Sequence, residues 1–202
     1  MADVKAVAFD WGGVLTSPPM AGLEAHERAA GLPAGALTRY FRGHPHLREL
    51  ETGTLPAREF WKRIGTEVQH EHGHRLDVRA AAASAESAVV TEPAALDLVR
   101  AVRATCRTAL VTNNIAESGW RAGFAFELFD VVLDSSAVGL RKPDGRLFAL
   151  LLEELQLPAS EVVFIDDLPE NLPEAAALGI DVIVFEDLDQ CRSELARRGV
   201  LT

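Results

Sequence analysis

From residue 92 onward, short apolar runs alternate with segments long enough to form helices, and this alternation constrains the fold more than any other feature. The expected strands are 108–111, 131–133, 162–165 and 182–185, and the expected helices are about 93–104, 116–127, 144–156, 170–178 and 188–198. Strands that alternate with helices pair in parallel through right-handed crossovers. With an apolar run near the N-terminus as a fifth strand, the sequence predicts an α/β fold with a doubly wound five-stranded parallel sheet.

The N-terminal run, residues 4–16, carries one acid into a glycine turn. Apart from Lys5 the run is apolar up to Phe9, Asp10 follows, and Gly12 and Gly13 interrupt it. Such a run is typical of a strand covered on both faces. Ligands bind open α/β sheets beyond the carboxyl ends of the strands, so Asp10 is a candidate site residue. A carboxylate at this place also has a simpler interpretation, as the cap of a turn.

Residues 17–88 have helical character. Apolar residues follow a helical spacing at about 21–30, 34–41, 57–70 and 78–88, and no strand-like run interrupts them. Phe60, Trp61 and Ile64 share one side of the third segment, as in an amphipathic helix. We therefore expect a small helical domain of residues 17–88 inserted into a core domain of residues 1–16 and 89–202.

Composition argues against several classes of partner. The 202 residues include 30 acidic and 20 basic side chains, a net charge of -10, and the basic ones are not concentrated, so no nucleic-acid partner is expected. Cys106 and Cys191 lie far apart and in no metal-binding spacing, which argues against a disulfide framework or a zinc site. No window approaches the ~20 apolar residues of a membrane helix, so we expect no membrane partner and a cytoplasmic location.

Polar residues follow several of the expected strands. Thr112, Asn113 and Asn114 come after one strand, Asp166 and Asp167 come after another, and Lys142 precedes the helix expected near 144. A helix N-cap explains any one of these positions. A hydroxyl, a cation and three carboxylates, counting Asp10, at one edge of a sheet favour a functional site instead.

These residues belong to four motifs that resemble, in order and spacing, those of the haloacid dehalogenase-like hydrolases. The motifs are Phe9-Asp10-Trp11-Gly12-Gly13-Val14, Thr112-Asn113, Lys142-Pro143, and Asp166-Asp167 extended through Asn171 and Gly179. The resemblance covers essentially the whole chain and implies a Rossmann-like core. The helical insertion and the stretch 49–55 resemble the cap of the branch that contains sugar-phosphate phosphatases and the phosphatase domain of soluble epoxide hydrolases.

The resemblance implies a Mg²⁺-dependent phosphatase that acts on a small phosphorylated metabolite as a monomer or homodimer. Asp10 is then the nucleophile that forms an aspartyl-phosphate, Thr112 binds a phosphoryl oxygen, and Lys142 offsets charge repulsion. The implied metal ligands are Asp10, the backbone carbonyl of Gly12, Asp166 and Asp167. The implied substrate-binding residues are Trp11, Gly12, Asn113 and Asn114.

The chain departs from the family pattern at Gly12. Most phosphatases of the family have a second Asp there, which protonates the leaving group and then activates water. Such a proton-transfer group contributes about 10² to 10⁴ in rate. We therefore expect a preference for substrates with good leaving groups, and an aspartyl-phosphate that accumulates.

Two other functions remain open at the level of sequence. A 2-haloacid dehalogenase uses the same Asp nucleophile on carbon without a metal, but Asp166 and Asp167 would then lie unneutralised beside Asp10. A binding or regulatory protein with this fold is the second alternative, and Gly12 favours it.

Specificity is expected to come from the helical insertion. The candidate residues there are Arg39, Tyr40, Arg42, His44, His46 and Trp61. Trp61 has an alternative interpretation as core of the insertion, and His44 and His46 flank Pro45 in an expected loop.

Overall fold

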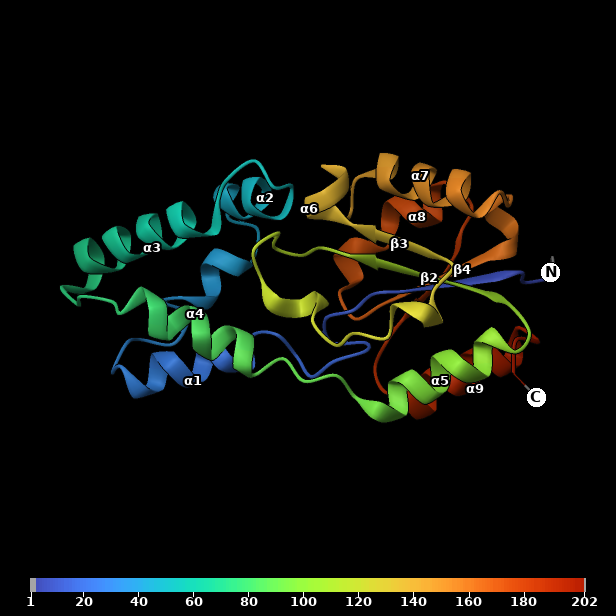
Figure 1. The fold of residues 1–202 in the computed structure, drawn as a ribbon, viewed down its shortest axis with the longest axis horizontal. Helices are drawn as coiled ribbons and strands as arrows, with labels where there is room; N and C mark the ends of the chain where they lie inside the picture. Colours follow the sequence, from blue (N-terminus) through green and yellow to red (C-terminus); the bar gives the residue numbers. More distant parts are fainter. Residues whose placement is uncertain (1–2, 202) are drawn as a thin grey trace.

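The computed structural model describes residues 3–201, and at its centre lies the predicted five-stranded parallel sheet (Figure 1). The strands are β1 (Ala6–Phe9), β2 (Arg107–Thr112), β3 (Val131–Asp134), β4 (Val162–Asp166) and β5 (Asp181–Val184). Their order is β3-β2-β1-β4-β5. Phe9 pairs with Leu110 on one side and with Ile165 on the other, so Asp10 emerges in the middle of the edge formed by the carboxyl ends.

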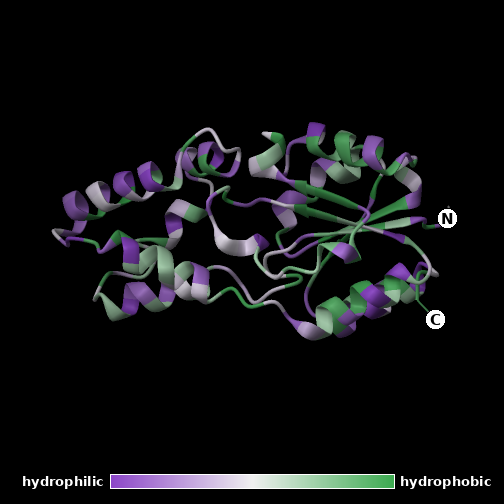
Figure 2. Cartoon of the chain, viewed as in Figure 1, coloured by the Kyte–Doolittle hydropathy of each residue, from purple (hydrophilic) through white to green (hydrophobic). Residues whose placement is uncertain are grey.

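Helices cover both faces of the sheet. Helices α5 (Pro93–Arg103) and α9 (Leu188–Arg197) lie on one face, and α7 (Gly145–Leu155) and α8 (Pro173–Ala177) lie on the other (Figure 1). The side chains of β1 alternate between these layers: Val7 and Phe9 belong to the apolar cluster with α5 and α9, and Ala6 and Ala8 to the cluster with α7. Figure 2 shows the strands as hydrophobic along their length, as expected of a sheet buried on both faces.

The segment between β1 and α5 is helical, and we call residues 17–88 the insertion. It contains α1 (Ala21–Ala29), α2 (Pro45–Glu51), α3 (Ala57–His72) and α4 (Val78–Ser87). It has an apolar cluster of its own, in which Phe60, Ile64 and Val68 are buried. The insertion lies beyond the carboxyl ends of the strands, while both chain termini lie at the opposite end of the sheet (Figure 1).

The two chain segments that join the insertion to the rest of the protein run side by side. Ser17 Oγ donates to the carbonyl of Ala88 at 2.7 Å and accepts from the N–H of Val90 at 2.9 Å. Thr16 and Thr91 form an isolated antiparallel bridge beside them. The insertion is therefore attached through one narrow, hydrogen-bonded connection.

The prediction of a helix over 116–127 is wrong. Only two short 3-10 turns form there, Gly119–Arg121 and Phe126–Leu128. Gly123 between them has φ +74°, which a continuous α-helix does not allow. Trp120 and Phe124 are buried in the apolar cluster with α5. The path of the backbone here therefore follows from the packing of aromatic side chains and not from helical periodicity.

Within the insertion, the helix expected over 34–41 shrinks to a 3-10 turn, Thr38–Phe41. The buried carboxylate of Glu27 accepts the N–H groups of Gly35, Leu37 and Thr38 at 2.7 to 3.1 Å, and so replaces the partners that a helix would provide.

The loop expected around His44 and His46 is instead the start of α2. The side chain of His44 caps that helix by accepting the N–H of His46 at 3.3 Å. Pro45 occupies the first helical turn, where proline is favourable.

The helix expected over 170–178 is divided into a 3-10 turn, Pro169–Asn171, and the short helix α8, because Pro173 starts a new helix.

Candidate active site

The buried centre of the site is a lysine held between two carboxylates. Asp10 directly follows β1, and its N–H donates to the carbonyl of Ile165 at 2.9 Å, which continues the β1–β4 ladder. Lys142 Nζ lies 2.7 Å from Asp10 Oδ1 and 2.6 Å from Asp166 Oδ2. All three residues are buried, so their charges interact with little screening by water. The sheet register thus unites residues that are distant in sequence.

Asp166 is oriented by further donors. Asn171 Nδ2 lies 3.0 and 3.2 Å from its two oxygens, and the N–H of Leu168 donates to Oδ1 at 2.9 Å. Together with Lys142 these donors hold the carboxylate in one orientation.

Asp167 approaches the glycine turn that follows Asp10. A Cβ on Gly13, whose φ is +81°, would lie 2.3 Å from Asp167 Oδ2, so only glycine fits there. Asp10, Asp166 and Asp167 each offer an oxygen, and these oxygens lie within 4.8 Å of one another. Oxygen atoms at this spacing are a donor set suited to Mg²⁺. Asp167 Oδ1 is buried with no hydrogen-bond partner in the described chain, which leaves it available for a cation.

The pKa values of the cluster reflect its burial. Burial, and then the charge of Asp166, raise the pKa of Asp10 to about 7, although Lys142 acts in the opposite direction. Burial and the charge of Asp166 likewise raise the pKa of Asp167 to about 6. Burial alone would lower the pKa of Lys142, but Asp10 and Asp166 raise it, so Lys142 stays cationic. The cluster carries more negative charge than one lysine offsets, and further positive charge would stabilise it.

Buried polar atoms without a partner gather around this cluster. Thr112 ends β2, is fully buried, and has a hydroxyl with no partner. Across residues 3–201 the buried side-chain atoms of this kind are Trp11 Nε1, Glu51 Oε2, Thr112 Oγ1, Asn114 Nδ2, Arg141 Nε and Asp167 Oδ1. Each such atom costs roughly 1 to 3 kcal/mol unless something else satisfies it. Glu51 Oε2 and Arg141 Nε face each other at 2.8 Å, and the other four atoms lie at the strand ends or in the loops that follow them, which makes this region the candidate binding site.

Asn113 and Asn114 have different surroundings. The Asn113 side chain holds the backbone of Lys142, accepting its N–H at 2.8 Å and donating to its carbonyl at 3.2 Å, so this amide positions the lysine. Asn114 Oδ1 accepts the N–H of Ile115 at 2.9 Å and the hydroxyl of Ser118 at 3.2 Å, while its Nδ2 stays free. Of the two side chains, Asn114 is the one whose amide nitrogen makes no hydrogen bond within the described chain.

The residues that follow Asp10 shape one wall of the site. The ring of Trp11 packs on Trp120 with centroids 5.4 Å apart, and its Nε1 has no partner. A Cβ on Gly12 would lie 3.0 Å from Cγ of Pro19, which is tight but leaves the backbone unstrained. Pro19 therefore occupies part of the space that a side chain at position 12 would need.

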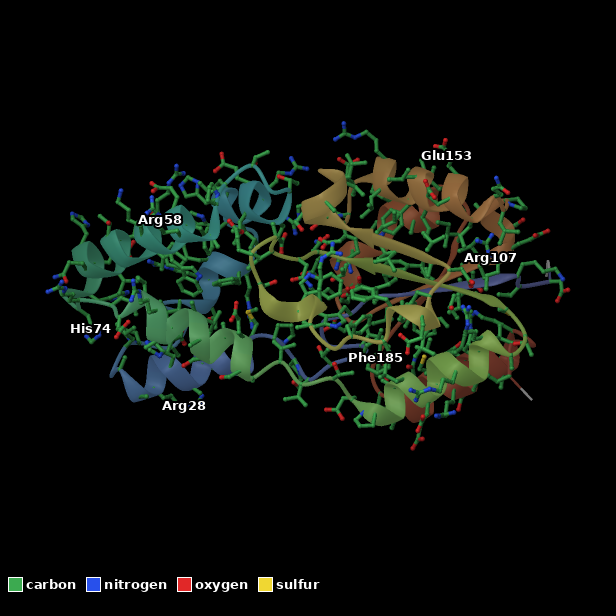
Figure 3. The ribbon with its side chains drawn as sticks, viewed as in Figure 1. Arg28, Arg58, His74, Arg107, Glu153 and Phe185 are labelled. Atoms are coloured by element: carbon green, nitrogen blue, oxygen red, sulfur yellow. The ribbon has the colours of Figure 1, made fainter. Side chains whose placement is uncertain are left out.

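The specificity candidates of the insertion make contacts within the insertion itself. Arg39 pairs with Glu71 and the hydroxyl of Tyr40, and His46 lies 3.0 Å from Glu49. Trp61 packs against Phe41 and Phe60, which agrees with its alternative interpretation as core. Arg42 is exposed, and His44 caps α2. Figure 3 shows Arg28 and Arg58 on the outer side of the insertion, away from the sheet.

Three residues that contact this cluster or the segment carrying Lys142 were not among the expected site residues, namely Asn171, Glu51 and Arg141. Asn171 orients Asp166, and Glu51 of α2 lies 2.8 Å from Arg141 (Oε2 to Nε) beside Lys142. Asn171 and Glu51 stand in stretches that resemble the family, and that resemblance was the available signal. The contact of Glu51 with Arg141 depends on how the insertion folds back, which no local pattern reveals.

Known proteins match this chain along most of its length. Residues 4–179 match the family model of the haloacid dehalogenase-like hydrolases. Mouse acyl-CoA dehydrogenase family member 10 is 32% identical over 200 residues, which are 95% of this chain and 19% of the mouse protein. Pig bifunctional epoxide hydrolase 2 is 28% identical over 96% of this chain and 38% of its own length. The chain thus spans only a part of these two relatives. A phosphatase of Mycobacterium tuberculosis is 28% identical over 96% of this chain and 93% of its own length.

Solved structures share the fold. A predicted HAD-like family hydrolase from Porphyromonas gingivalis superposes with a TM-score of 0.72 at 21% identity, covering 97% of this chain and 99% of its own. A HAD family enzyme from Bacteroides thetaiotaomicron, in complex with magnesium and inorganic phosphate, has a TM-score of 0.68 at 20% identity, covering 93% and 98%. The L-2-haloacid dehalogenase of Xanthobacter autotrophicus has a TM-score of 0.63 at 21% identity, covering 96% and 83%. The chain belongs to the haloacid dehalogenase-like hydrolases.

Proposed function

We propose that this hydrolase is a Mg²⁺-dependent phosphatase that transfers the phosphoryl group of a small phosphorylated metabolite to Asp10 and then to water. The observation that carries the proposal is the buried set of Asp10, Lys142, Asp166 and Asp167 beside the free hydroxyl of Thr112. The phosphatase among the full-length relatives supports the same activity. We further propose residues 17–88 as a cap domain over a core of 1–16 and 89–202.

Mg²⁺ would be held by Asp10, Asp166 and Asp167, with the backbone carbonyl of Gly12 as a further ligand. The three carboxylates fit the ion, since their oxygens lie close together and Asp167 Oδ1 has no other partner. When bound, the ion supplies positive charge that offsets the repulsion between Asp10 and a phosphate dianion.

Asp10 would attack phosphorus through Oδ2. Its Oδ1 is engaged by the N–H of Trp11 at 2.6 Å and by Lys142 at 2.7 Å, which orients the carboxylate and leaves the other oxygen free. The new bond joins Oδ2 to phosphorus while the bond to the leaving oxygen breaks, and water then cleaves the aspartyl-phosphate. Lys142 and the Thr112 hydroxyl would stabilise charge on the phosphoryl oxygens.

Gly12 leaves the departing oxygen without an internal acid. We expect kcat to rise as the pKa of the leaving group falls, so that aryl phosphates outpace glycerol phosphate under chemistry-limited conditions. A series of substituted phenyl phosphates measures this slope, and intact-mass spectrometry after mixing with substrate detects the phosphoryl adduct on Asp10. Equal kcat values for aryl and alkyl phosphates, with no adduct, would contradict a missing acid.

The activity itself is tested with 4-nitrophenyl phosphate, with Mg²⁺ and with EDTA. Asp10→Asn removes the nucleophile and should lower kcat at least a thousandfold, whereas Asp97→Asn, the same change at an exposed position of α5, should leave it unchanged. Turnover that survives both EDTA and Asp10→Asn would refute the proposal. Chloride release from 2-chloropropionate in EDTA would identify a dehalogenase, and binding of phosphorylated compounds without turnover would identify a non-catalytic protein.

A further inference from the structure

The turn that follows α2 docks the insertion onto the strand-end loops. Ser135 Oγ donates to the backbone carbonyl of Glu51 at 2.5 Å, and it also accepts the N–H of Asn114 at 3.0 Å. Gly53, with φ +73°, passes so close to Ser136 that an added Cβ would lie 2.8 Å from the carbonyl oxygen. Figure 1 shows α2 beside α6 (Ser135–Val138), the helix that follows β3. A chain of contacts thus runs from the end of β2 through Ser135 to the insertion.

An ion pair crosses the same junction. Glu51 Oε2 lies 2.8 Å from Arg141 Nε, and the two side chains are only 14% and 20% exposed. Neither of these two atoms has a hydrogen-bond partner within the described chain, so each is compensated mainly by the charge of the other. Burial raises the pKa of Glu51 to about 7, while Arg141 and Lys142 act to lower it. Separating the pair while the junction stays closed would leave two buried charges uncompensated, which is strongly unfavourable.

Arg141 directly precedes Lys142, so the ion pair reaches the reacting centre through one peptide bond. The backbone of Lys142 is held by Asn113 from the sheet, and its side chain ends between Asp10 and Asp166. Glu51 contacts the same short segment from the opposite side. The segment 139–143 is therefore held between the sheet and the insertion.

We propose that Glu51 is a positioning residue that, through Arg141, couples closure of the insertion over the site to the placement of Lys142. When the insertion is docked, the pair holds the segment that carries the lysine. When it swings away about the narrow connection near Ser17, both charges return to water and the segment loses its contact with the insertion, keeping only those with the core, such as Asn113 on its backbone and Asp10 and Asp166 on the lysine. The catalytic use of this coupling rests on the proposed phosphatase function, whereas the coupling itself does not.

Hydrogen–deuterium exchange and small-angle X-ray scattering test the coupling without turnover. Glu51→Gln keeps the shape of the side chain and removes its charge. We expect exchange across 139–143 and 51–54 to rise at least tenfold and the radius of gyration to increase, with helical content unchanged. Glu49→Gln is the matched control, because Glu49 lies on the same helix with its side chain 51% exposed and pairs with His46 and Arg63 inside the insertion. The Glu49→Gln control should have the exchange rates and the radius of gyration of the unmodified protein.

Kinetics with 4-nitrophenyl phosphate and Mg²⁺ give the second readout. Glu51→Gln should lower kcat at least tenfold and leave KM within threefold, because Lys142 acts on the reacting group. Arg141→Gln tests the pair from the other side and is judged by the same criteria if Glu51→Gln fails to fold. Exchange in 139–143 within twofold of the unmodified protein would overturn the coupling. Absence of turnover in the unmodified protein would instead count against the phosphatase proposal, and exchange would still judge the coupling.

Discussion

At the scale of single residues, the site contains two glycines whose roles differ. Gly13 is required by its backbone, because its φ of +81° and the contact with Asp167 leave no room for a side chain. Gly12 has no such backbone requirement, and only Pro19 opposes a side chain there. The missing acid at position 12 is therefore matched by a proline that fills part of its space.

This difference predicts how an acid at position 12 will behave. Gly12→Asp alone should raise kcat for alkyl phosphates little, because Pro19 prevents the carboxylate from reaching its place. Gly12→Asp with Pro19→Ala should raise that kcat at least tenfold, within the range expected of a general acid. Steady-state assays with glycerol phosphate measure both, and Pro19→Ala alone is the control. An equal gain from Gly12→Asp with and without Pro19→Ala would show that Pro19 does not obstruct.

At the scale of elements, α7 is the helix that begins just after Lys142. Asp144 caps it by accepting the N–H of Arg146 at 3.0 Å, and the Arg146 guanidinium pairs with the same carboxylate at 2.6 Å. The hydrogen bond from Arg146 lowers the pKa of Asp144 to about 2. The cap thus defines the end of the segment that presents the lysine.

Removal of this cap should have a measurable and pH-dependent cost. Asp144→Ala should lower the free energy of unfolding by about 1 kcal/mol at pH 7, or Tm by roughly 2 to 4 °C. Because the pKa of Asp144 is lower in the folded protein than in the unfolded chain, its stabilisation is present above about pH 4 and is lost as pH falls toward about 2. Thermal melts of both proteins across this range measure the effect. Asp144→Asn keeps a hydrogen-bond acceptor, so it should lower the free energy of unfolding less than Asp144→Ala does. A difference in Tm between the unmodified protein and Asp144→Ala that grew toward pH 2 would contradict the role of the Asp144 carboxylate as a cap.

At the scale of the whole molecule, the insertion and the sheet have separate apolar clusters joined by a narrow connection. The shared junction is mainly polar, formed by Ser135, Arg141 and the turn after α2, with Ile115 packed against the insertion cluster as an apolar contact. Fully buried side chains such as Phe60 stabilise the insertion without touching the sheet clusters. Local stability should therefore differ between the two parts.

Phe60→Ala tests this division. The cavity should destabilise the insertion by roughly 3 to 5 kcal/mol. Hydrogen–deuterium exchange should become faster across α1 to α4 while β1, β2 and β4 keep their protection. The matched change in the sheet layers, Phe148→Ala, should accelerate exchange in α7 and the strands. Uniform acceleration throughout the chain after Phe60→Ala would show a single cooperative unit instead.

The solved structures that share this fold include an enzyme in complex with magnesium and inorganic phosphate and a 2-haloacid dehalogenase. The fold alone therefore does not select the reaction. The described chain also contains no helix that is both long and apolar enough to span a membrane.

Sequence by itself determined the α/β class, the five parallel strands, the helical insertion and the strand-end residues, because strand and helix periodicity and the four motifs are local patterns. Local patterns failed at 116–127, where packing of buried aromatic side chains shapes the chain, and at 34–41, where the Glu27 carboxylate accepts N–H groups in place of helical carbonyls. Only the tertiary structure brought Asn113 to the backbone of Lys142, Pro19 to Gly12, and Glu51 to Arg141. The last of these contacts joins segments that are 90 residues apart, and whether they meet depends on how the insertion packs against the sheet.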